Sequence, residues 1–176
     1  GVQFGLFGMS ILLLGTAKHH KKYLPQVGTL ELPGSFAMTE SGHGSNVRDI
    51  ETTATYDHAE GGFIIHTPNH LARKDYIGNA ACHAQMATVF AKLMIGGTDF
   101  GVNAFLVPLR DKEGQLLPGI KIEDCGLKMG LNGVDNGRIG FTQVKVPKEN
   151  MLDRFAWVND SGQFESSIAS DIRRFF

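Results

Sequence analysis

Hydrophobic residues recur at helical spacing at the start of the chain. Phe4, Phe7, Ile11 and Leu14 lie three or four residues apart, which is the period of one helix face. The pattern therefore predicts an amphipathic or buried helix that ends near Tyr23. A Leu-Pro pair follows at once and is expected to break the helix.

Farther along, the pattern changes to short strands. The stretch 50–56 is β-branched and alternates, which places Ile50, Ala54 and Tyr56 on one face of a strand. A turn cluster and the return 63–67 complete a predicted hairpin. Pro108 is expected at a strand end or edge, because it has no N–H for the ladder. Further strand-length apolar runs are 86–94, 102–109 and 120–123.

The apolar phase slips between Arg138 and Val146, which predicts a β-bulge near Thr142-Gln143. Six or seven short strands with glycine-rich turns predict a mainly β fold, an antiparallel β-barrel or sandwich. The stretch 164–176 predicts the start of another helix. Partial α-helices on both sides indicate the middle domain of a longer protein.

Charge and cysteine content limit the classes of partner and the cellular environment. Seventeen Lys+Arg against eighteen Asp+Glu give a net charge of −1, which argues against nucleic acid or a membrane surface as a partner. The apolar start is shorter than the roughly 20 residues of a membrane span. Cys82 and Cys125 allow one bridge at most, so a reducing, intracellular environment is favoured.

The strongest candidate for chemistry is the stretch FAMTESGHGSN, residues 36–46. A strand that runs into a loop with two glycines, a serine and an asparagine offers N–H and hydroxyl groups to an anion or to the polar edge of a ring. A solvent-exposed turn is an equally good interpretation. The loop matches neither a P-loop nor a dinucleotide-binding fingerprint.

A second candidate is the stretch 72–81, in which Tyr76 stands beside Gly78-Asn79. An aromatic side chain there can stack on a planar cofactor while the glycine allows close approach. The pattern alone favours a strand edge with a core tyrosine.

No metal site is predicted. Adjacent histidines on a helix point about 100° apart, so His19-His20 is interpreted as a solvated helix end. Cys82 and His83 have no partner at zinc spacing and are interpreted as packing residues. Glu40 is a possible base, but nothing local in the sequence argues for a raised pKa.

Several ordered motifs resemble those of the acyl-CoA dehydrogenase and acyl-CoA oxidase superfamily. FAMTESGHGSN resembles its flavin-contacting loop, and KDYIGNA, GLKMGLNGVDNG and VKVPKENML follow at family spacing. IETTATYD and FIIHTP resemble the oxidase branch more than the dehydrogenase branch. The resemblance covers essentially the whole chain.

The resemblance implies three segments and a flavin site. The segments are the end of an N-terminal helical domain with a linker (1–33), a middle β-barrel domain (34–150), and a linker with the start of a C-terminal helical domain (151–176). Seven residues are implied to contact FAD: Met38 and Thr39 along the isoalloxazine ring, Gly44 and Ser45 at the flavin phosphates and the pantetheine, and Tyr76, Ile77 and Gly78 beside the ring.

Gly78 replaces a hydroxyl residue that many dehydrogenases of the superfamily carry. The hypothesis is that glycine leaves space above the ring, through which dioxygen reaches the reduced flavin.

The implied reaction is the desaturation of a fatty acyl-CoA to trans-2-enoyl-CoA in fatty-acid β-oxidation, with electrons passed to O2 to give H2O2. The catalytic glutamate of the family lies in the C-terminal helical domain, so no catalytic residue is named here and the chain alone is expected to be inactive. A homodimer is implied, in the cytoplasm if the protein is bacterial and in the peroxisome if it is eukaryotic. The alternatives are a dehydrogenase that uses an electron carrier and a non-catalytic β scaffold.

Overall fold

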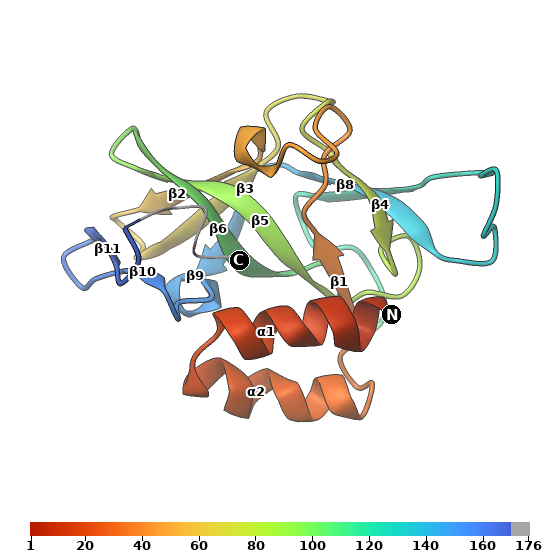
Figure 1. The fold of residues 1–176 in the computed structure, drawn as a ribbon, viewed down its shortest axis with the longest axis horizontal. Coiled ribbons are helices and arrows are strands. Elements are labelled where there is room, and N and C mark those ends of the chain that lie inside the picture. Colours follow the sequence, from red (N-terminus) through yellow and green to blue (C-terminus); the bar gives the residue numbers. More distant parts are fainter. Residues whose placement is uncertain (170–176) are drawn as a thin grey trace.

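The computed structural model describes residues 1–169 and begins with two helical segments. A π-helix, Val2–Gly8, continues directly into α1, Met9–Leu14, and α2 spans Ala17–Gly28 (Figure 1). The single helix predicted to end near Tyr23 is therefore wrong in both its continuity and its end. The chain is extended at Gly15, and α2 restarts at a capping box between Thr16 and His19.

Pro25 lies inside α2 and does not end it. A proline removes one helical hydrogen bond, but Val27 in the following turn is 3% exposed. It lies so close to Gly8 that a Cβ added there would be 3.1 Å from the Val27 Cγ1. Burial of Val27 in this contact stabilises the last turn of α2 despite the proline.

Eleven strands are present among residues 1–169, and the predicted mainly β fold is confirmed. A curled six-stranded sheet contains β1 (Gly34–Ala37), β2 (Thr53–Asp57), β3 (Gly62–His66), β5 (Met86–Ile95), β6 (Thr98–Pro108) and β9 (Val144–Pro147). A three-stranded sheet contains β4 (Lys74–Gly78), β7 (Ile120–Asp124) and β8 (Asn136–Phe141). A separate hairpin joins β10 (Ala156–Val158) and β11 (Phe164–Ser166), and short 3-10 helices are Val47–Asp49 and Lys148–Asn150.

Most strand pairs are antiparallel, including the predicted hairpin of β2 and β3. Both β1 and β2 nevertheless run parallel to β5, one after the other along the same edge. The other edge of β5 pairs with β6 along its whole length. As predicted, Pro108 is the last residue of its strand.

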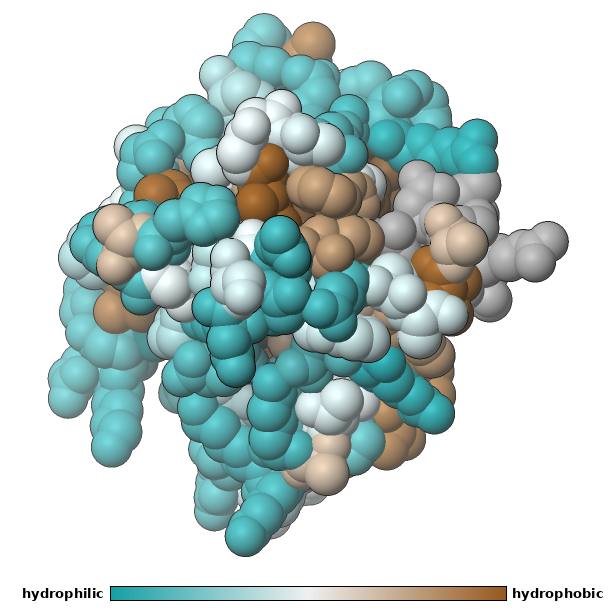
Figure 2. Space-filling view, turned by 90° about the vertical axis from the view of Figure 1, so that its left-hand side faces the viewer, coloured by the Kyte–Doolittle hydropathy of each residue, from teal (hydrophilic) through white to brown (hydrophobic). Residues whose placement is uncertain are grey.

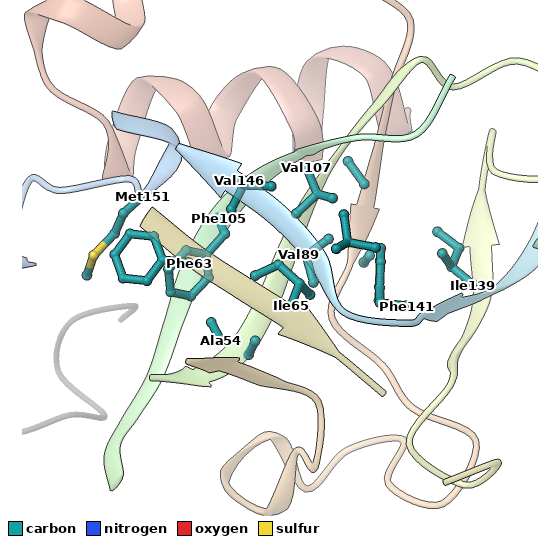
Figure 3. Close-up of a cluster of buried hydrophobic side chains, with 14 of the residues drawn as sticks. Ala54, Phe63, Ile65, Val89, Phe105, Val107, Ile139, Phe141, Val146 and Met151 are labelled. Atoms are coloured by element: carbon teal, nitrogen blue, oxygen red, sulfur yellow. The ribbon is translucent and has the colours of Figure 1, made fainter. Parts of the chain in front are cut away.

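The core has two layers, one on each face of β5 and β6. Between the sheets lie large side chains such as Phe63 and Phe105, whose ring centroids are 5.0 Å apart (Figure 3). On the other face, Phe7 and Ile11 of the helical segments pack against Phe90 and its neighbours. Burial on both faces explains why β5 and β6 are continuous apolar runs without alternation.

Three predictions about the pattern are wrong. Ile50 lies before β2 and packs in the helix-facing layer, whereas Ala54 and Tyr56 pack between the sheets. The phase slip near Gln143 is a turn that takes the chain from β8 in one sheet to β9 in the other, with Gln143 at φ 51°. The stretch beginning at Phe164 opens as strand β11 and not as a helix, while residues 170–176 lie outside the described part.

The face formed around β2, β10 and β11 is mainly hydrophilic, with scattered small apolar areas (Figure 2). Within residues 1–169, no helix combines the length and the hydropathy that a membrane span requires.

Candidate functional site

The two candidate motifs, far apart in sequence, lie side by side in the structure. The Asp75 N–H donates to the Thr39 carbonyl at 3.0 Å, and the Ser41 N–H donates to the Arg73 carbonyl at 2.9 Å. An isolated antiparallel bridge pairs Glu40 with Lys74. The loop after β1, residues 38–46, therefore continues as an extended segment along β4.

Side chains alternate across this pairing. Glu40 and Lys74 point inward and are fully buried, while Thr39 is exposed. The Thr39 hydroxyl donates to the Asp75 carbonyl at 2.8 Å. A hydroxyl has one proton and two lone pairs, so the exposed Thr39 oxygen is free to accept a hydrogen bond from a ligand. Met38, one residue earlier, is half-buried.

Tyr76 is at a β-bulge. The register between β4 and β8 shifts between Lys74 and Ile77, and Tyr76 has φ 55°. Bulges of this kind redirect a side chain, and the Tyr76 side chain is 61% exposed. The interpretation as a core tyrosine is therefore wrong, and a flat aromatic surface faces outward beside the Thr39 segment.

Ile77 and Gly78 are buried beneath this surface. The Gly78 carbonyl accepts a hydrogen bond from the Ser35 hydroxyl at 2.8 Å. A Cβ added at Gly78 would lie 2.7 Å from the Val2 Cγ2. The expected open space at this glycine is therefore absent, because Val2 of the π-helix fills it.

Gly44 and Ser45 lie on the exposed far part of the loop. Reciprocal hydrogen bonds between the backbones of Glu40 and His43 close the turn before them. A Cβ at Gly44 would meet nothing within 4 Å, so the surface there is open. The Ser45 carbonyl accepts from the Val47 N–H, within the same loop. The structure thus brings Thr39 to the β4 segment and leaves Gly44-Ser45 at the other end of the loop.

A buried ion pair lies under the loop. The Lys74 ammonium is 3.0 Å from the Glu40 Oε1 and also donates to the carbonyls of Met38 at 3.0 Å and Phe90 at 2.7 Å. Burial lowers the pKa of Lys74 to about 8, although the Glu40 carboxylate acts to raise it. Glu40 further accepts from the N–H groups of Glu51 and Thr52 and from the Thr52 hydroxyl.

Asp75 organises the outer side of the same segment. Its carboxylate accepts from the Tyr76 N–H, from the Arg138 Nε and from the Ser41 hydroxyl, each at 2.9 Å. Partial burial acts to raise the pKa of Asp75, but these hydrogen bonds and the Arg138 charge outweigh it and hold the pKa below its ordinary value. Asp75 therefore stays an anion that fixes the bulge.

The 126–137 motif approaches Tyr76 from β8. The Asn136 side chain donates to the Tyr76 carbonyl at 3.2 Å, and the Lys128 ammonium donates to the Asn136 Oδ1 at 2.6 Å. A cation therefore lies one side chain away from the aromatic surface. The same loop exposes large apolar side chains, namely Leu127, Met129, Leu131 and Val134.

The histidine and cysteine predictions are partly wrong. His19 is buried in the first turn of α2, where its Nε2 lies 2.9 Å from the Glu149 carbonyl, and is not at a solvated helix end. His20 is half-buried. Cys82 and His83 are exposed and not packing residues, and His83 bonds Asp135. In the described part of the chain, no group of three or more His, Cys, Asp and Glu side chains is placed to hold a metal ion.

Sequence reasoning missed the inner half of the site. It considered Glu40 only as a possible base, and it gave Lys74 no role. Lys74 stands between two other charged residues, Arg73 and Asp75, so the sequence does not distinguish it, and its bridge to Glu40 joins distant segments. Asp75 and Arg138 were also missed, because their contact joins β4 to β8 across 63 residues.

The family model described as "Acyl-CoA dehydrogenase, middle domain" matches residues 35–144. The peroxisomal acyl-coenzyme A oxidase 2 of Arabidopsis thaliana is 50% identical, over 99% of this chain and 26% of its own length. An acyl-coenzyme A oxidase of Candida glabrata is 48% identical, over 90% of this chain and 22% of its own length. The chain thus spans about a quarter of the length of these relatives.

Solved structures of acyl-CoA oxidases are similar to this chain in fold. Acyl-CoA oxidase 3 from Yarrowia lipolytica is 42% identical with a TM-score of 0.93, over 98% of this chain and 25% of that one. Acyl-CoA oxidase-1 of Caenorhabditis elegans, in complex with FAD and ATP, is 38% identical with a TM-score of 0.92, over 94% of this chain and 25% of that one.

Proposed function

We propose, from the premise that this chain belongs to the acyl-CoA dehydrogenase middle-domain family, that it is the flavin-contacting β-domain of an FAD-dependent acyl-CoA oxidase. The observation that carries the proposal is the pairing of the Thr39 segment with β4, which presents an open hydroxyl oxygen beside an outward-facing tyrosine ring. A β scaffold without a cofactor has no need of this combination.

The described residues fit a flavin. The exposed Tyr76 ring offers a stacking surface for a planar cofactor. The Thr39 oxygen offers an acceptor to its polar edge, and the open surface at Gly44-Ser45 leaves room for its phosphates. We assign Met38, Ile77 and Gly78 to the wall beside the ring, through their backbone. When bound, FAD accepts the electrons of the reaction and passes them on.

The contribution of this chain is to hold the cofactor and to orient it. The Thr39 hydroxyl is fixed by the Asp75 carbonyl, and Tyr76 is fixed by the bulge and by Asn136. Fixed groups of this kind interact with a cofactor without reorganising during the reaction. We assign no catalytic residue among those described, and we expect the chain alone to leave acyl-CoA unreacted.

The oxidase assignment rests on the relatives, which bear the name acyl-CoA oxidase. We therefore propose fatty acyl-CoA as the substrate, desaturated to trans-2-enoyl-CoA, and O2 as the electron acceptor that yields H2O2. We further propose a homodimer, with a peroxisomal location if the source is eukaryotic and a cytoplasmic one if it is bacterial.

The test is a visible spectrum of the intact natural protein in air, before and after a long-chain acyl-CoA is added, with a peroxide assay in parallel. We expect a bound flavin that returns to the oxidised form while peroxide accumulates. A flavin that bleaches and stays bleached in air would instead mean a dehydrogenase with an electron carrier. A protein that takes up no FAD would leave a non-catalytic scaffold.

A further inference from the structure

We infer that Lys74 and Glu40 are positioning residues, whose buried contact sets the spacing between the Thr39 segment and the Tyr76 bulge and so shapes the surface that receives the flavin ring. The inference rests on the proposed function, since it concerns how the proposed FAD surface is held. Neither residue is exposed, so both act through the loop and not on a ligand directly.

The first argument is the number of bonds at the ammonium. Three oxygens surround the Lys74 Nζ, those of Met38, Glu40 and Phe90. An ammonium has three N–H donors and a neutral amine has two. The site is therefore complete only around the charged form of Lys74.

The second argument is what these oxygens belong to. Met38 lies in the loop after β1, Phe90 in the central strand β5, and Lys74 itself in β4. One ammonium therefore fixes the backbone of the loop to two strands at once. Glu40 adds a link to a third strand, because its carboxylate accepts hydrogen bonds from the backbone N–H groups of Glu51 and Thr52, which lead into β2.

The third argument is the alternation of side chains. Successive residues of an extended segment point to opposite faces. Glu40 and Lys74 face inward as a bridged pair, so Thr39 and Asp75 face the other way, and Tyr76 follows at the bulge. A shift of the inner pair is transmitted directly to the outer surface.

The fourth argument is energetic. A buried ion pair is often neutral or unfavourable compared with apolar residues of similar volume, because both ions lose their water. Its presence here, where both side chains are fully buried, indicates a role in geometry more than in stability.

The test uses the intact natural protein, freed of cofactor and titrated with FAD, with the visible spectrum of the bound flavin recorded. The variants are Lys74→Met and the double variant Lys74→Met/Glu40→Gln. The double variant removes the unpaired buried carboxylate that the single variant leaves, and so keeps the test valid if the single variant does not fold. The controls are two changes on β9 away from the loop, Val146→Ala for lost core packing and Lys145→Met for a lost charge.

We expect both Lys74 variants to bind FAD at least about 10-fold more weakly and to shift the absorption bands of the bound flavin, while both controls bind as the unchanged protein does. The double variant should melt closer to the unchanged protein than the single variant does, yet retain the altered spectrum. A purely structural pair would lose the spectral change along with the instability. A double variant with unaltered FAD affinity and spectrum would overturn the inference and leave the proposed function intact. Failure of the unchanged protein to bind FAD would overturn both.

Discussion

Adding a single methyl group at Gly78 tests how the π-helix meets the candidate site. In Gly78→Ala the new Cβ would lie 2.7 Å from the Val2 Cγ2, whereas ordinary contact begins at 3.4 Å. The Val2 side chain or the segment that carries it must therefore shift by about 0.7 Å, the difference between these distances. Overpacking of this kind costs about 1–3 kcal/mol, and alanine in place of glycine within a strand returns about 0.5–1 kcal/mol. We expect a net loss of up to about 2.5 kcal/mol in the free energy of unfolding.

A second substitution should relieve the overlap between the new Cβ and Val2. Val2→Ala removes the Cγ2 atom, so the double variant Val2→Ala/Gly78→Ala should be at least as stable as Val2→Ala alone. Gly140→Ala on β8 is the matched control, because its Cβ would meet only the Arg73 Cγ, at 3.9 Å. The assay is urea unfolding of the intact natural protein, with the coupling between positions 2 and 78 taken from the double-mutant cycle.

Two results would refute the reasoning. One is a Gly78→Ala variant no less stable than Gly140→Ala, and the other is a loss that Val2→Ala does not relieve. The same cycle separates packing from oxygen chemistry. An effect of Gly78→Thr on oxygen reactivity is informative only in the Val2→Ala background, where the Cγ2 atom that overlaps the added Cβ is removed.

Three further predictions follow from the same contacts. Burial lowers the pKa of Lys74 from 10.5 to about 8, so between these pH values the unfolded chain binds more protons than the folded chain. The free energy of unfolding should therefore rise with pH in this range, by up to about 3 kcal/mol. Urea unfolding of Lys74→Met should lack this rise, and the same pH dependence in the variant and the unchanged protein would contradict the prediction. In Gly34→Ala the Cβ would lie 2.0 Å from the Phe7 ring, which is fully buried, so we expect a loss of at least about 3 kcal/mol in the same assay; stability equal to Gly140→Ala would be the contrary result. Stacking of aromatic rings contributes about 0.5–1.5 kcal/mol, so Tyr76→Ala should weaken FAD binding about 2- to 12-fold in a fluorescence titration while Tyr76→Phe does not. Equal affinities would exclude stacking.

A feature of this fold can be predicted from the sequence when neighbouring residues determine it. The hairpin of β2 and β3 and the strands β5, β6 and β7 follow from alternation, apolar runs and turns, which are properties of neighbouring residues. The break at Gly15 does not, because residues at helical spacing are buried on both sides of it, Phe7 and Ile11 before and Tyr23 and Val27 after. Nor does the change of sheet at Gln143, where a bulge and a turn give the same slip of phase.

The candidate site, too, could be predicted only as far as local patterns allow. The types of residue at Thr39 and Tyr76 raised the possibility of a ring-binding surface, and family resemblance assigned them to a flavin. Their nearness depends on the bridge between Glu40 and Lys74, which are 34 residues apart. A local pattern could not reveal this pairing, and it favoured a core tyrosine at position 76 because aromatic residues are enriched in half-buried strands.

Two costly features meet at this one place. A non-glycine residue at positive φ, such as Tyr76, costs on the order of 1–3 kcal/mol. The buried pair beneath it carries a desolvation penalty that its attraction only partly offsets. Either feature could be replaced by an ordinary strand with apolar side chains, which would cover the same core and turn the tyrosine inward. The fold instead keeps the ring exposed and the backbone beside it fixed. That combination is what the proposed flavin site requires, and it brings no gain in stability to the domain by itself.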